Sequence, residues 1–171
     1  MTKSAFLLGL LGVAQFGPVM FLSLFAGVVV DRYPKKSLLL FTQSFLMLQA
    51  FVLALLVWSG HIVYWEVLML AVLLGLVNTL DLPTRQSFIP ELVDRKDIRS
   101  AIGLNSTIVN IARMIGPAIS AVLMARFGAG PLFFLNGLSF IPVIMGLYLI
   151  KAKSVVIKKV EKKYLSKFRK D

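Results

Sequence analysis

The chain has 171 residues, of which 58% are hydrophobic and 16% are charged, and its mean hydropathy is +0.84. Soluble domains are about half apolar and about a quarter charged, so this composition excludes a soluble globular fold and predicts an integral membrane protein. The formal charge is +11. Cysteine is absent, and its absence excludes disulfides, thiol catalysis and thiolate metal sites. We expect no metal and no cofactor.

Five apolar stretches are long enough to cross a bilayer, which takes about 20 helical residues. Their uninterrupted hydrophobicity predicts helices, because backbone groups in lipid must be satisfied within their own segment and barrel strands would alternate. The sequence therefore predicts an all-α transmembrane helix bundle over residues 1–150. The expected spans are residues 5–30, 38–58, 64–82, 102–125 and 131–150.

A short charged turn follows the first span. Gly27 precedes Asp31 by one helical turn, so the two share a face on which a neighbouring helix can approach closely. Asp31 ends a helix, where the macrodipole disfavours a carboxylate unless cations compensate. We interpret this turn as a charge latch that breaks and re-forms during a conformational change; the alternative is an ordinary basic loop with one acid. The latch residues are Gly27, Asp31, Arg32, Lys35 and Lys36.

The end of the third span carries a second charged pair. Asp81 lies one turn before Arg85, and Pro83 between them is expected to disrupt the helix. Two interpretations remain open for this intramembrane charge. Asp81 and Arg85 either pair at the interface and hold the helix end in place, or they couple to the latch.

The fourth span places Arg113 about ten residues inside the apolar run, near the middle of the bilayer. A charge there faces a cavity or a partner by default. Arg113 can neutralise Asp81, contact an anionic substrate, respond to a protonatable acid, or form a structural ion pair. Ser106, Asn110, Arg113 and Pro117 form a polar stripe, and the neighbouring helix-packing motif comprises Ala112, Gly116, Pro117 and Ser120.

Other polar residues inside the spans form a weaker set. Each is expected either to line a central cavity or to make a hydrogen bond between helices. They are Gln15, Asn105, Asn110 and Asn136.

The basic residues predict the orientation. They lie in the loops after the first span (Arg32, Lys35, Lys36) and after the third span (Arg85, Arg95, Lys96, Arg99), and residues 151–171 are strongly basic, so the positive-inside rule places these segments in the cytoplasm. Five spans with a cytoplasmic C-terminus place the N-terminus outside, although the short polar start of the chain gives little reason for that. A further helix before Met1 would place the start of the protein inside. In the tail, Ile157, Val160, Tyr164 and Phe168 recur at helical spacing, which predicts a basic amphipathic helix; a disordered lysine-rich end is the alternative. No nucleic-acid module accompanies the charge, so we expect no nucleic-acid partner.

Three of these segments resemble motifs of the major facilitator superfamily of transporters, in the order that the family has them. The segment from Gly27 to Lys36 resembles the loop between helices two and three, although Pro34 stands where that pattern often has glycine. The Asp-x-Pro-x-Arg stretch at residues 81–85, followed by Pro-Glu-Leu-Val, resembles the drug- and siderophore-exporter branch, which includes enterobactin and macrolide exporters. Arg113 with Gly116 and Pro117 resembles the glycine-proline motif of the fifth helix in antiporters.

The resemblance implies helices two to six of a twelve-helix transporter, with residues 151–171 as a cytoplasmic tail that begins the loop between its halves. It further implies proton-coupled efflux of a small amphipathic molecule, of drug or siderophore type, by alternating access across the cell membrane. The expected partners are that small molecule, protons, the lipid bilayer and the missing transporter half; no enzyme activity is expected. The alternatives are a non-transporting membrane subunit or assembly partner, and an inactive truncated product.

Overall fold

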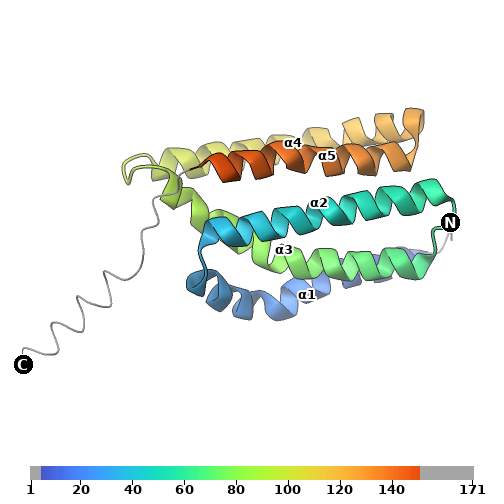
Figure 1. Cartoon of the computed structure of the whole chain (residues 1–171), viewed down its shortest axis with the longest axis horizontal. Coiled ribbons are helices and arrows are strands. Elements are labelled where there is room, and N and C mark those ends of the chain that lie inside the picture. Colours follow the sequence, from blue (N-terminus) through green and yellow to red (C-terminus); the bar gives the residue numbers. More distant parts are fainter. Residues whose placement is uncertain (1–4, 151–171) are drawn as a thin grey trace, which may run out of the picture.

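The computed structural model describes residues 5–150, which form five long helices, each running antiparallel to the next one in the chain (Figure 1). Every helix is long and apolar enough to cross a membrane, so the predicted all-α transmembrane bundle is confirmed. The helices are α1 (Ala5–Arg32), α2 (Lys35–Ser59), α3 (Tyr64–Leu92), α4 (Ile98–Phe127) and α5 (Ala129–Leu149). The predicted tail helix at Ile157, Val160, Tyr164 and Phe168 lies outside the described residues.

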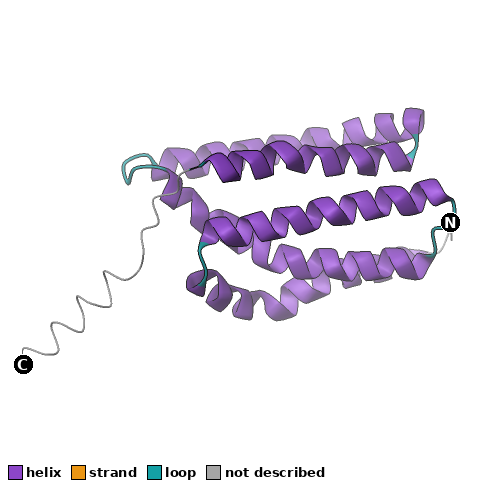
Figure 2. Ribbon diagram, viewed as in Figure 1, coloured by secondary structure: helices purple, strands orange, loops and turns teal. Residues whose placement is uncertain are grey.

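Short turns connect the helices (Figure 2). The α2–α3 and α4–α5 connections use Gly60 and Gly128, whose φ angles of 72° and 79° favour glycine. At the start of α3, the Glu66 carboxylate accepts the backbone N–H of Val63 at 3.1 Å, which satisfies one of the free donors of a helix N-terminus. These local signals mark where α2 and α4 end and where α3 begins.

The helices pack unequally. The most extensive contacts join α1 to α3, α2 to α5 and α2 to α3, and most buried residues therefore lie on α2 and α3. α4 makes only limited contacts with α5 and α3, and none of its residues is buried by the described chain. Four helices thus form the packed part of the molecule, and α4 lies along its side.

Glycines set the closest approaches. A Cβ atom on Gly75 would lie 2.3 Å from the backbone oxygen of Gln15, so α1 can rest on α3 only because residue 75 has no side chain. On the α2–α5 contact, Gly130 receives the Trp58 ring and Gly137 receives the Phe51 ring. Small residues that admit close neighbours are a common device for packing helices in lipid.

The third helix differs from its predicted length. We expected it to end at residue 82, with Pro83 disrupting it; these expectations are wrong. α3 continues through Pro83 and Pro90 to Leu92, so Arg85 lies within the helix. Figure 1 shows α3 changing direction in this part, which is the usual effect of a proline inside a helix.

Hydroxyl side chains bond back to the preceding turn on both sides of Pro83, which has no N–H to donate. Thr79 donates to the carbonyl of Gly75 at 2.8 Å, and Thr84 donates to the carbonyl of Leu80 at 2.5 Å. Bonds of this type, back to the preceding turn, often bend helices. The proline is therefore a bend in a continuous helix.

One end of the bundle carries the α1–α2 turn, the α3–α4 loop and the C-terminal end of α5 (Figure 1). We call it the basic end, after Arg32, Lys35, Lys36, Arg95, Lys96 and Arg99. There Leu39 of α2, Phe88 of α3 and Leu147 of α5 form a buried apolar cluster. The cluster fixes three helices against one another beside the charged residues.

Candidate functional site

Lys35 attaches the α1–α2 turn to the end of α3. Its Nζ lies 2.6 Å from Oε1 of Glu91, and the two side chains are only 19% and 23% exposed. An ion pair that is partly removed from solvent is screened less than a surface pair. The turn is therefore held to the C-terminal end of α3.

Lys36 attaches the same turn to α5. Its Nζ donates to the backbone oxygens of Tyr148 at 2.9 Å and of Ile150 at 2.7 Å. The last carbonyls of a helix have no partner within the helix, and a cation there is also favoured by the macrodipole. Two consecutive lysines thus join α2 to two different helices at the basic end.

The other predicted latch residues lie on the surface. Gly27, Asp31 and Arg32 are exposed, and no atom lies within 4 Å of a Cβ built on Gly27. Within residues 5–150, the ion pairs are Lys35–Glu91 and Asp81–Arg85, so Asp31 and Arg32 form none there. Of the five predicted latch residues, the two lysines therefore contact other helices, and the other three are exposed.

Asp81 is the centre of a buried polar cluster between α2 and α3. The residue is 3% exposed. Its Oδ1 accepts Thr42 Oγ1 at 2.6 Å and Gln43 Nε2 at 2.7 Å, and its Oδ2 accepts Arg85 Nη2 at 2.9 Å. A buried carboxylate needs such donors, because losing one costs about 1–3 kcal/mol. Asp81 and Arg85 are thus brought together one turn apart on α3.

Three members of these contacts were not singled out from the sequence: Thr42, Gln43 and Glu91. Thr42 and Gln43 interrupt the apolar run of α2 near its start, and a polar residue inside a span normally finds a partner. That signal could have identified them as polar contacts, but it does not say which acid they contact. Glu91 follows Pro90 in the Pro-Glu-Leu-Val stretch. The third helix was predicted to end at residue 82, so Glu91 was not expected to lie on a helix.

Arg113 is separate from the Asp81 cluster. It is exposed on α4, and it forms no ion pair with residues 5–150. Ala112, Pro117 and Ser120 are also exposed, and no atom lies within 4 Å of a Cβ on Gly116. Within the described chain, no helix packs tightly on this small-residue stripe.

The weaker polar set lies on three helices. Gln15 of α1 and Asn105 of α4 are half-buried, whereas Asn110 of α4 and Asn136 of α5 are exposed. A further polar residue, Gln49, donates from Nε2 to the Leu70 oxygen at 2.7 Å and leaves its buried Oε1 without a partner in the described residues. The structure does not gather the four predicted residues at one point.

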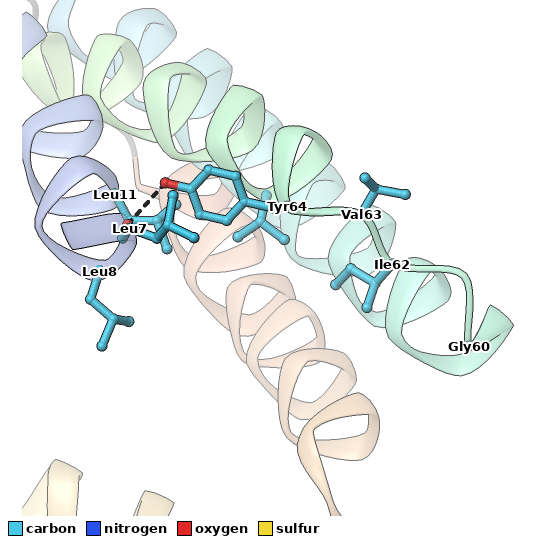
Figure 3. Close-up of a pocket in the computed structure, with 8 residues that line it drawn as sticks. Leu7, Leu8, Leu11, Gly60, Ile62, Val63 and Tyr64 are labelled. Carbon is cyan, nitrogen blue, oxygen red and sulfur yellow. Dashed lines mark hydrogen bonds between the residues drawn. The ribbon is translucent and has the colours of Figure 1, made fainter. Parts of the chain in front are cut away.

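A pocket of about 580 Å³ lies at the opposite end of the bundle, between α1 and the α2–α3 connection (Figure 3). The Tyr64 hydroxyl crosses to α1 and donates to the Leu7 oxygen at 2.9 Å. The other lining residues are mostly aliphatic: Leu7, Leu8, Leu11, Ile62, Val63 and Val67, with Gly60. None of the residues predicted to line a cavity contributes to this pocket.

The chain is similar to known transport proteins over most of its length. A family model described as transmembrane secretion effector matches residues 1–169. The staphyloferrin A transporter of Staphylococcus aureus (strain NCTC 8325 / PS 47) is 33% identical over 143 residues, which are 83% of this chain and 36% of that protein. Macrolide efflux protein A of Enterococcus faecalis is 24% identical over 123 residues, covering 72% of this chain and 36% of that protein.

An uncharacterised MFS-type transporter of Bacillus subtilis (strain 168) is also 24% identical over 123 residues, covering 72% of this chain and 28% of that protein. The chain thus spans about a third of the length of these relatives. No solved structure shows a significant match to it.

Proposed function

The chain belongs to the transmembrane secretion effector family of the major facilitator superfamily, and from this premise we propose that it is part of an exporter of a small amphipathic molecule. The observation that carries the proposal is the single family match over residues 1–169 of a multi-pass membrane protein. The names of the relatives support a substrate of siderophore or macrolide type.

In this proposal the basic end faces the cytoplasm, as the positive-inside rule favours. The two lysines attach the α1–α2 turn to α3 and α5, so a force applied to the turn is transmitted to three helices. Asp31 is exposed in the last turn of α1, beside this turn, and takes the role of the latch. Transport follows alternating access, in which one half of the transporter moves against the other around a central site, and a proton gradient drives it.

Further helices of the transporter are proposed to cover α4. Its middle carries Arg113 and an exposed polar stripe, and a charge at that depth is costly when it faces lipid. The adjacent small residues suit close packing of another helix. A non-transporting assembly partner is the second candidate function, favoured by the same uncovered face of α4, and it predicts a stable complex with no flux.

The test is substrate efflux in vesicles from cells that express the native gene, with and without an imposed pH gradient. Asp31→Asn should slow the gradient-driven flux several-fold while the amount of protein in the membrane stays unchanged. Asp94→Asn is the matched control, because it removes the same charge from an exposed position on the other basic-end loop. Equal flux in the two variants would count against the latch, and no efflux from the unmodified protein would count against export.

A further inference from the structure

Two apolar grooves run along α3, one on each side of a ridge formed by Leu76 and Leu80. The first groove lies between α3 and α2 and has a volume of about 210 Å³. The second lies between α3 and α1 and has a volume of about 280 Å³. Both leucines line both grooves, so the grooves are neighbours on one face of the bundle. The remaining lining is leucine, valine, alanine and phenylalanine, with Thr42 in the first groove and Thr79 in the second.

The two threonines use their hydroxyls within the protein. Thr42 Oγ1 donates to Asp81 Oδ1 at 2.6 Å, and Thr79 Oγ1 donates to the Gly75 oxygen at 2.8 Å. Both residues are buried, at 0% and 4% exposure, so their hydroxyls are not presented to an occupant. The grooves therefore suit hydrocarbon, and they do not suit a molecule that needs hydrogen bonds.

This face of the bundle favours lipid over another helix as its cover. Helix contacts in membranes are rich in small and polar residues. The grooves are bordered by bulky exposed side chains, including Phe25, Phe41 and Leu76, and no charged side chain of the described residues lines either of them. Arg113 and the small residues beside it lie on α4, which is the face that we proposed further helices to cover.

Arg32 continues the second groove at the end of α1. It comes three residues after Val29, which lines that groove, so it lies one turn further on nearly the same face and about 4.5 Å along the helix axis. The headgroup layer is about 5–8 Å thick on each side of the hydrocarbon. A phospholipid whose chains fill the grooves thus has its phosphate at the level of Arg32.

The charge of Arg32 is available to such a phosphate. Arg32 is exposed and forms no ion pair with residues 5–150, whereas Lys35 and Lys36 are bound to α3 and α5. The neighbouring Asp31 lies on the other side of α1, because the nine residues from Leu22 to Asp31 make two and a half turns. The positive charge is therefore next to the grooves and the negative charge is turned away from them.

We propose that the two grooves bind the two acyl chains of one anionic phospholipid, whose phosphate is held by Arg32. The Leu76–Leu80 ridge separates the two chains, and the lipid belongs to the leaflet at the basic end. In the proposed orientation this is the cytoplasmic leaflet, whose surface carries anionic lipids. The site does not depend on export, because it follows from the grooves and the position of Arg32.

The experiment measures the quenching of tryptophan fluorescence by phospholipids with brominated acyl chains, using the full chain in vesicles. Phe41→Trp places a reporter in the first groove and Phe25→Trp places one in the second; both replace an exposed aromatic side chain with another aromatic one. Each variant is measured with brominated phosphatidylglycerol in phosphatidylcholine vesicles, and with brominated phosphatidylcholine in phosphatidylglycerol vesicles. The native Trp58 and Trp65 lie at the opposite end of the bundle and supply the reference.

We expect both groove reporters to prefer phosphatidylglycerol over phosphatidylcholine about fivefold, which is the effect of one basic residue near a membrane surface, and the native tryptophans to show no preference. Adding Arg32→Gln should remove the preference at both reporters, because one lipid occupies both grooves. Arg95→Gln is the matched control and should keep the preference. It removes the same charge from an exposed position at the same end of the bundle.

Three results overturn the proposal. Equal quenching by the two lipids at either reporter would show that its groove holds ordinary bilayer lipid. Equal effects of Arg32→Gln and Arg95→Gln would show a general attraction to the basic end. Absence of quenching by both lipids would show that another helix covers the grooves. None of these measurements involves flux, so failure of the lipid site is distinguishable from failure of the proposed export.

Discussion

The contact between α1 and α3 at Gly75 offers the sharpest test of the fold. In Gly75→Ala, the new Cβ would lie 2.3 Å from the Gln15 backbone oxygen and 3.1 Å from Cγ of Pro18. Ordinary contacts begin at 3.4 Å, so the two helices have to separate by about 1 Å. The atom in the way belongs to the backbone and cannot rotate aside, so the whole of α1 has to move.

The expected cost follows from this displacement. Overpacking a well-packed contact costs about 1–3 kcal/mol, and a clash with backbone belongs at the upper end of that range. Alanine is also a better helix former than glycine, by about 1 kcal/mol, which offsets part of the loss. Gly12→Ala on α1 is the matched control, because nothing lies within 4 Å of its Cβ and it receives the same helix-propensity gain.

The free energy of unfolding is measured in detergent by denaturant titration, with the fluorescence of Trp58 and Trp65 as the signal. We expect Gly75→Ala to be less stable than Gly12→Ala by about 3 kcal/mol, since the difference removes the shared helix-propensity term. Equal stability of the two variants would refute the close approach of α1 to α3.

Two further predictions concern the other helix contacts. In the same titration, Gly137→Ala should have a free energy of unfolding about 1–2 kcal/mol below that of Gly146→Ala. The reason is that a Cβ on residue 137 would lie 2.7 Å from the Phe51 ring, whereas a Cβ on residue 146 would meet no atom within 4 Å. Equal stability of the two variants would contradict the α2–α5 packing. Reversing the charge of Lys35 alone, or of Glu91 alone, should lower the free energy of unfolding, and reversing both charges together should recover part of that loss. We expect a coupling energy of about 1 kcal/mol between the two residues in this double-mutant cycle. Additive effects of the two reversals would show that the ion pair does not form.

Much of the fold was predictable because lipid leaves few alternatives. Five apolar runs had to be helices, and the first, second, fourth and fifth runs have observed bounds close to the predicted ones. The third was misjudged at Pro83, since a proline ends most helices in water. Around Pro83, the hydroxyls of Thr79 and Thr84 bond back to the preceding turn, and the helix continues. Whether a helix bends at a proline or ends there depends on how it packs against its neighbours, which hydropathy does not report.

The sequence by itself determined that the chain is a bundle of membrane helices, and its motifs identified the family. Both follow from local properties: the apolar length of each segment and the spacing of a few charged, glycine and proline residues. The tertiary structure alone decided which groups meet. Asp81 bonds to Thr42 and Gln43 on another helix, and Lys35 and Lys36, adjacent in the chain, reach α3 and α5. These partners depend on the rotation and depth of each helix against its neighbours, which are set by close contacts such as Gly75 on Gln15.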